Sequence, residues 1–135
     1  MGDDKMAHIR IGLCSVFVED QARALEFYTE RLGFVTQTDI QVGEFRFLTV
    51  AAPDGPEGIE LLLEPNVHPA AEAYQKAIKA DGIPATSFFV DDLQSEYERL
   101  CELGVVFTTS PMELGDVKIA VFDDTCGNLI QLTQK

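Results

Sequence analysis

The sequence has few basic residues, and this limits the partners it can be expected to bind. Only ten of its 135 residues are lysine or arginine, against 23 aspartates and glutamates, which gives a formal net charge of −13. An electrostatic field of this sign repels nucleic-acid phosphates and anionic lipid headgroups. Nucleic acid and membrane surfaces are therefore not expected partners, whereas a cationic ligand is compatible with the charge.

Cysteines and long apolar runs are also scarce. Cys14, Cys101 and Cys126 are odd in number, far apart and without a CxxC pair, which fits a reducing compartment better than a disulfide framework. We expect Cys14 and Cys101 to be small core residues, and Cys126 to be a turn residue rather than a reactive thiol. The N-terminal stretch MGDDKMAHIR lacks the apolar core of a signal peptide, and no apolar run approaches the ~20 residues of a membrane span. The sequence predicts a cytoplasmic protein.

The sequence contains one pattern that occurs twice. The stretches FVEDQARALEFYTERLGF (17–34) and FVDDLQSEYERLCELGVVF (89–107) both begin with Phe-Val-acid-Asp and continue with apolar residues at helical spacing. Asp20 and Asp92 are placed as helix N-caps, 92 − 20 = 72 residues apart, and Gly33 and Gly104 are placed to end the helices. The sequence therefore predicts two copies of one structural unit.

The repeat extends into the flanking strands. A strand-like run precedes each helix, three β-rich runs follow it, and pairing Glu60 with Gln131 gives an offset of 131 − 60 = 71 residues. This pattern predicts an α+β fold of two tandem βαβββ modules, whose curved mixed sheets form a concave pocket. We expect one domain over 1–135, with module one at about 8–64, a connector helix at about 65–82 that begins near Pro69 and ends near Gly82, and module two at about 83–134.

Several motif residues in this arrangement are similar to those of the vicinal oxygen chelate superfamily, which includes glyoxalase I, extradiol dioxygenases and bleomycin-resistance proteins. The residues that carry the resemblance are Val18, Asp20, Phe27, Tyr28, Leu32, Gly33 and Phe34 in the first module, and Val90, Asp92, Asp124, Gly127 and Asn128 in the second. The resemblance implies the paired-module fold and a homodimer. It is not specific for one reaction, because this fold carries many chemistries.

In the enzymes of that superfamily, a divalent metal is held by one side chain from the first strand and one from the last strand of each module. The resemblance puts these four positions at Leu13, Glu60, Ala85 and Gln131. Leu13 and Ala85 have no donor atoms, and one carboxylate with one amide is a poor set for a divalent ion. His8 lies on the opposite strand face from Leu13, and the role of His68 in the connector stays open. We therefore predict no metal and no cofactor.

Strand alternation predicts the lining of the pocket. Side chains two residues apart share one face of a strand, so the residues expected to bind a ligand are Leu13, Ser15, Phe17, Glu60, Leu62, Ala85, Ser87, Phe89 and Gln131. Glu64, Leu129 and Thr133 share that face, and the opposite residues (Cys14, Val16, Val18, Leu61, Leu63, Phe88, Val90, Ile130, Leu132) are expected beneath the helices. A plainer interpretation also stays open, in which the two phenylalanines fill the core and Gln131 is a polar residue on a wet sheet face.

Three functional hypotheses follow. The first is a metal-independent small-molecule-binding protein that resembles the bleomycin-resistance branch, with a cationic or aromatic ligand, Glu60 as acceptor and Gln131 as its neutral partner. The second is an enzyme of glyoxalase, isomerase or dioxygenase type, with an atypical metal site or with Glu60 alone as catalytic base. The third is an interaction module whose pocket no longer binds a ligand.

Overall fold

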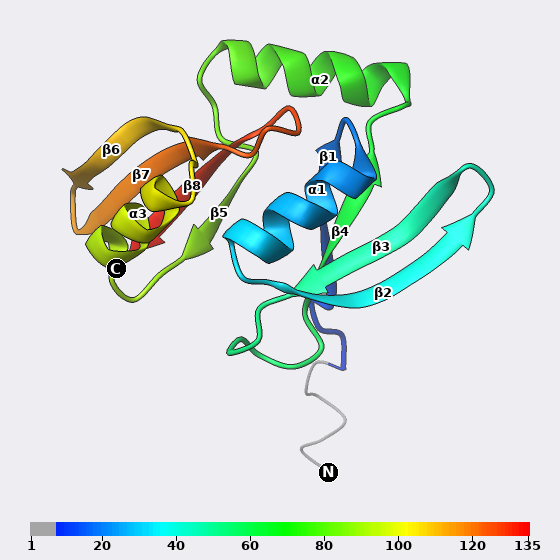
Figure 1. Ribbon diagram of the computed structural model, residues 1–135, viewed down its shortest axis with the longest axis horizontal. Helices are drawn as coiled ribbons and strands as arrows, with labels where there is room; N and C mark the ends of the chain where they lie inside the picture. Colours follow the sequence, from blue (N-terminus) through cyan, green and yellow to red (C-terminus); the bar gives the residue numbers. More distant parts are fainter. Residues whose placement is uncertain (1–7) are drawn as a thin grey trace.

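A computed structural model describes residues 8–135 and contains the two predicted modules (Figure 1). In the first, β1 (Leu13–Val18), β2 (Val35–Val42), β3 (Phe45–Ala51) and β4 (Glu60–Pro65) form a sheet of order β1-β4-β3-β2. In the second, β5 (Thr86–Phe89), β6 (Phe107–Leu114), β7 (Val117–Asp123) and β8 (Leu129–Gln134) form a sheet of order β5-β8-β7-β6. In each sheet the first strand is parallel to the last and the other pairs are antiparallel. The predicted fold class is confirmed.

The helices begin and end where the sequence places their caps. The Asp20 carboxylate accepts the Arg23 N–H at the start of α1 (Gln21–Glu26), and the Asp92 carboxylate accepts the Ser95 N–H at the start of α3 (Leu93–Glu102), both at 3.1 Å. The first helix continues as a π-helical turn, η2 (Phe27–Arg31). Gly33 and Gly104 follow the two helices with φ of 85° and 86°, a left-handed conformation that glycine adopts without strain.

The connector is α2 (Pro69–Ala80), which lies along one side of both modules (Figure 1). It begins at Pro69, as predicted, and ends at Ala80, two residues before Gly82, and His68 is its N-cap. The His68 Nδ1 accepts the Ala70 N–H at 3.0 Å, and this contact gives His68 a role that the sequence left open.

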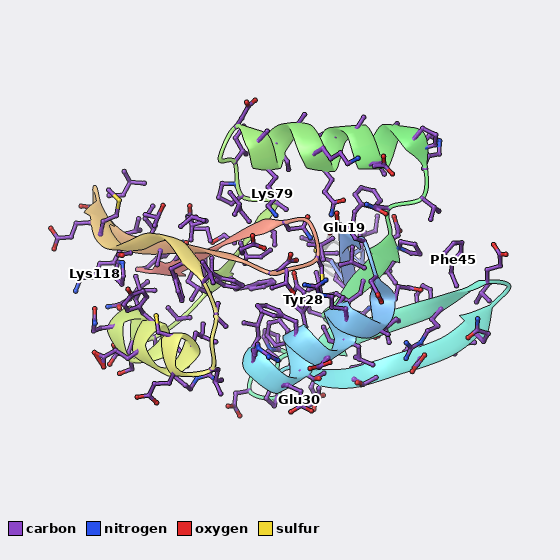
Figure 2. All side chains as sticks on the ribbon, turned by 45° about the horizontal axis from the view of Figure 1, so that its top comes forward. Glu19, Tyr28, Glu30, Phe45, Lys79 and Lys118 are labelled. Carbon is purple, nitrogen blue, oxygen red and sulfur yellow. The ribbon has the colours of Figure 1, made fainter. Side chains whose placement is uncertain are left out.

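The core lies on the predicted faces of the sheets. Val16, Val18, Leu63, Ile130 and Leu132 are buried in one cluster, and Leu61, Phe88 and Val90 pack against it. This cluster belongs to both modules, because the rings of Phe27 and Tyr28 on η2 contact Phe122 and Phe88 of the second module with centroids 5.9 and 6.5 Å apart. Figure 2 shows Tyr28 where the two modules meet.

The prediction that Cys14 and Cys101 are core residues was wrong, whereas Cys126 does lie in a turn. Cys14 and Cys101 are exposed, whereas Cys126 is buried. Cys14 lies on the helix-facing side of β1, but it lines a hollow between the modules rather than the core. Cys126 is buried because its turn is drawn into a polar cluster by Asp124, whose carboxylate accepts the Cys126 N–H at 2.7 Å.

That cluster explains the Asp124-Gly127-Asn128 motif as a structural device. Asp124 is fully buried and accepts hydrogen bonds from the Tyr28 hydroxyl at 2.6 Å and from the Asn128 amide at 2.8 Å. The Asn128 amide also donates to the Phe17 carbonyl at 2.7 Å. Gln75 of α2 donates to that same carbonyl at 2.9 Å. The motif therefore ties together β1, the first helix, α2 and the turn between β7 and β8.

The N-terminal stretch that lacks a signal-peptide core lies mostly outside the described residues. Within residues 8–135, no helix is long and apolar enough to cross a membrane.

Candidate functional site

The first half of the candidate site is the open face of the sheet β1-β4-β3-β2. Leu13 lies opposite Glu60, Ser15 opposite Leu62 and Phe17 opposite Glu64 along the β1–β4 pair, so five predicted site residues share this face. Leu13 is 48% exposed and Ser15 is exposed, while Phe17, Glu60 and Leu62 are half-buried. Phe45 and Phe47 of β3 stand on the same face, because Thr49 two residues further on pairs with Leu62.

Glu60 is held by a residue that the sequence interpretation missed. The Thr49 hydroxyl donates to the Glu60 carboxylate at 2.5 Å, and Thr49 is fully buried. A hydrogen bond from a buried hydroxyl fixes the orientation of the carboxylate that accepts it. The signal that could have found Thr49 is the alternation Phe45-Phe47-Thr49, which puts it on the face of Glu60.

The second half is the corresponding face of the sheet β5-β8-β7-β6. Ser87 lies directly opposite Gln131, and Ala85 precedes β5 at an exposed position. The Gln131 amide donates to the Thr133 hydroxyl at 3.1 Å, and the Ser87 hydroxyl lies 2.7 Å from the same oxygen. Gln131 therefore finds its hydrogen-bond partner on its own strand, while Glu60 finds Thr49.

Phe89 contacts a cation of the chain itself. Its ring is 66% exposed, and the ammonium of Lys135 lies over it, 4.8 Å from the ring centroid. A lysine over the face of an aromatic ring is a cation–π contact. The chain thus provides its own example of a cation on this surface.

Three hollows adjoin these faces. A hollow of about 280 Å³ between the modules is lined by Glu60 and Ser87 together with Cys14, Phe34 and Phe88. A second, of about 540 Å³, lies under the loop 52–59 and also reaches Glu60. A third, of about 410 Å³, is lined by Phe89 and the start of α3. Glu60 and Ser87 are thus brought together, while the other predicted site residues lie on the open faces or, for Phe89, in the third hollow.

The four positions that hold a metal in the superfamily's enzymes do not fit an ion here. Leu13 and Ala85 present only carbon, and Glu60 already accepts the Thr49 hydroxyl. Among residues 8–135, no three His, Cys, Asp or Glu side chains are grouped so that they could hold a metal ion. What this arrangement can do chemically is accept hydrogen bonds from a ligand at one oriented carboxylate, beside apolar walls.

Comparison with known proteins identifies the family. The family model of the Glyoxalase/Bleomycin resistance protein/Dioxygenase superfamily matches residues 6–132. The uncharacterized protein YurT of Bacillus subtilis (strain 168) is 59% identical over 127 residues, which are 94% of this chain and 100% of YurT.

Solved structures share the fold of this chain. The crystal structure of UcmS2 is similar with a TM-score of 0.82 and 31% identity, covering 96% of this chain and 100% of UcmS2. That of TnmS3, an antibiotic binding protein from Streptomyces sp. CB03234, is similar with a TM-score of 0.73 and 28% identity, covering 96% of this chain and 98% of TnmS3. With the repeat, the fold and the matched residues in agreement, the chain belongs to the Glyoxalase/Bleomycin resistance protein/Dioxygenase superfamily.

Proposed function

We propose that this protein binds a small organic molecule without a metal, in the manner of the bleomycin-resistance branch of its superfamily. The proposal rests on the surroundings of the Glu60 side chain. Its carboxylate is oriented by Thr49 on a sheet face of leucine and phenylalanine side chains, while Leu13 and Ala85 stand where the superfamily's enzymes have metal ligands. The similarity to TnmS3, an antibiotic binding protein, supports a ligand of this kind.

The ligand is a compact aromatic molecule with a positive or hydrogen-bond-donating group. Glu60 accepts from that group, and Phe17, Leu62 and Phe89 supply apolar contact. The contact between Lys135 and Phe89 supports a cation at this surface, and the net charge of −13 favours its approach. A charge-assisted hydrogen bond to Glu60 contributes about 1.5–3 kcal/mol, or about one to two decades of affinity.

The proposal includes a homodimer in the cytoplasm. Apolar side chains on the open faces and hairpins stay exposed in a single chain, among them Leu13, Ile40, Val42, Met112 and Leu114, and a second copy would cover faces and strand edges of this kind. A reducing compartment agrees with the three cysteines, all of which are free.

Two dyes of one shape test the role of Glu60. Proflavine is a flat cation at neutral pH, and acridine has the same ring system without the charge. Glu60→Gln is expected to weaken proflavine binding about tenfold or more, and to leave acridine binding nearly unchanged. Glu102→Gln, at an exposed position of α3, removes the same charge far from the site and is the matched control.

Calorimetry on the three proteins decides the outcome. Equal proflavine affinities for wild type and Glu60→Gln would show that Glu60 is not the acceptor. Elemental analysis of protein purified without chelators is the second measurement. A stoichiometric metal that disappears with Glu60→Gln would favour an enzyme instead.

A further inference from the structure

The two modules differ in the pairing between their third and fourth strands. In the second module, β7 and β8 pair over six consecutive residues, from Lys118 opposite Gln134 to Asp123 opposite Leu129. In the first module, β3 pairs with β4 only at Thr49 with Leu62 and at Val50 with Leu61. The β2–β3 hairpin therefore separates from β4 and extends away from the body as an arm (Figure 1). Figure 2 shows Phe45 out on this arm.

The side chain of Gln21 occupies the place where the strands separate. Its amide N–H groups donate to the carbonyl of Arg46 on β3 at 2.7 Å and to the carbonyl of Leu63 on β4 at 2.9 Å. Its amide oxygen accepts the backbone N–H of Arg46 at 3.0 Å. One side chain thus replaces the ladder between the two strands and satisfies three backbone groups, which would be costly to leave unpaired.

The sequence removes one donor from the ladder that would continue between these strands. Continuing the register of Thr49 with Leu62 would place Arg46 opposite Pro65, and proline has no N–H to donate. At the position equivalent to Gln21 in the second module, 93 − 21 = 72 residues later, stands Leu93. Leu93 is buried in the core, and the ladder of its module is complete. The arm is therefore a property of Gln21 and Pro65, and the fold alone does not require it.

The arm is braced internally and exposes apolar side chains. Arg46 donates two hydrogen bonds to the Asp39 carboxylate across the hairpin, at 2.9 and 2.6 Å, and these hold the pKa of Asp39 below its usual value. Phe47 pairs with Ile40 and Phe45 with Val42, on the face that also carries Glu60. Ile40 and Val42 are 57% and 60% exposed. The contact between Arg46 and Asp39 therefore joins the two strands of the arm into one unit, which Gln21 links to β4.

We propose that Gln21 is a positioning residue that fixes the angle of the β2–β3 arm, and so sets the width of the ligand-binding face between Glu60 and the phenylalanines of the arm. The width selects ligands by the size of their aromatic system, with a flat ring system of several fused rings preferred over a single ring. This inference rests on the proposed function, because it assigns the size of the ligand that the same face binds.

Gln21→Met tests the proposal, since methionine keeps the length of the side chain and removes its three hydrogen bonds. Gln21→Asn is a second variant, which keeps the amide and shortens its reach. The matched control is Gln41→Met, because Gln41 lies on the same arm and its amide donates to Gly43 within the hairpin, at 2.9 Å. The probes are proflavine, a tricyclic cation, and benzylamine, a cation with one ring.

The expected result is a change in selectivity. Gln21→Met should lower the proflavine-to-benzylamine affinity ratio about tenfold, the equivalent of about one net hydrogen bond, while Gln41→Met leaves the ratio unchanged. A general loss of stability would lower both affinities together and would not move the ratio. Hydrogen exchange of the Arg46 amide should become at least about tenfold faster in Gln21→Met and Gln21→Asn.

Two outcomes would overturn the inference. An unchanged affinity ratio in both Gln21 variants shows that the arm does not select by size, and an equally protected Arg46 amide shows that Gln21 does not hold the arm. If the wild-type chain binds neither probe, the proposed function is wrong. The exchange of Arg46 then decides separately whether Gln21 positions the arm.

Discussion

Folding raises the pKa of two side chains, the Cys126 thiol and the Tyr28 hydroxyl. Burial and the neighbouring Asp124 raise the pKa of Cys126 from 9.0 to about 12. Burial, followed by the charge and hydrogen bond of Asp124, raises the pKa of Tyr28 well above 10.0. Both groups are neutral when protonated, so the stability they support is complete below pH 9 and is lost as the pH rises.

The resulting prediction is a steep loss of stability in alkali. Each group lowers the free energy of unfolding by up to ~1.4 kcal/mol per pH unit once the pH exceeds its unfolded pKa. Urea unfolding of wild type and Cys126→Ala between pH 8 and pH 11 measures the effect. This range includes the unfolded thiol pKa of 9.0. The variant should lose stability less steeply over this range, and parallel curves would contradict the assignment to Cys126.

Both the backbone conformation at position 127 and the neighbouring Gln75 require a glycine there. Its φ is 102°, and a Cβ atom at this position would lie 2.7 Å from the Gln75 amide nitrogen. We expect Gly127→Ala to destabilise the protein by about 2–4 kcal/mol, because strain and the displacement of a buried amide add. Gly104→Ala is the control, since its φ is 86° and nothing lies within 4 Å of the added atom. Equal unfolding free energies for the two variants would show that the contact with Gln75 is unimportant.

At the scale of elements, α2 is attached to the body by the polar side chain of Gln75, together with an ion pair between Lys79 and Asp123 at 3.2 Å. Gln75 is buried, and it donates to the carbonyls of Phe17 and Cys126 and accepts from Asn66. Gln75→Met should lower the free energy of unfolding by about 1–3 kcal/mol, since it leaves buried partners unpaired. The amides of α2 should also exchange faster. Gln94→Met removes an exposed amide from α3 and should change neither measurement; a similar change in both variants would argue against α2 being held by Gln75.

Elements built from local signals could be predicted from the sequence. The caps Asp20 and Asp92, the terminating glycines and the period of the repeat depend on residues close together in the chain. Alternation along the strands predicted which of their residues face the core, with Cys14 as the exception. The parts that could not be predicted depend on distant partners, such as the Gln21 amide between β3 and β4 and the burial of Cys126 by the polar cluster. The same holds for the site, where alternation gave the faces but not Thr49 as the partner of Glu60.

At the scale of the whole molecule, the net charge of −13 acts in opposite directions on the two proposed associations. Two copies of the chain repel each other, whereas a cationic ligand is attracted. Added salt screens both effects, with a Debye length of about 10 Å at 0.1 M. Salt should therefore strengthen the proposed homodimer and weaken proflavine binding.

Light scattering and calorimetry over one series of sodium chloride concentrations measure both effects. With rising salt, we expect the dimer fraction at micromolar concentration to increase and the proflavine affinity to fall, while the affinity of uncharged acridine stays nearly constant. The uncharged dye is the control for changes in the protein itself. A chain that stays monomeric throughout would refute the homodimer. Proflavine binding that does not depend on salt would show that apolar contact, rather than charge, brings the ligand to this surface.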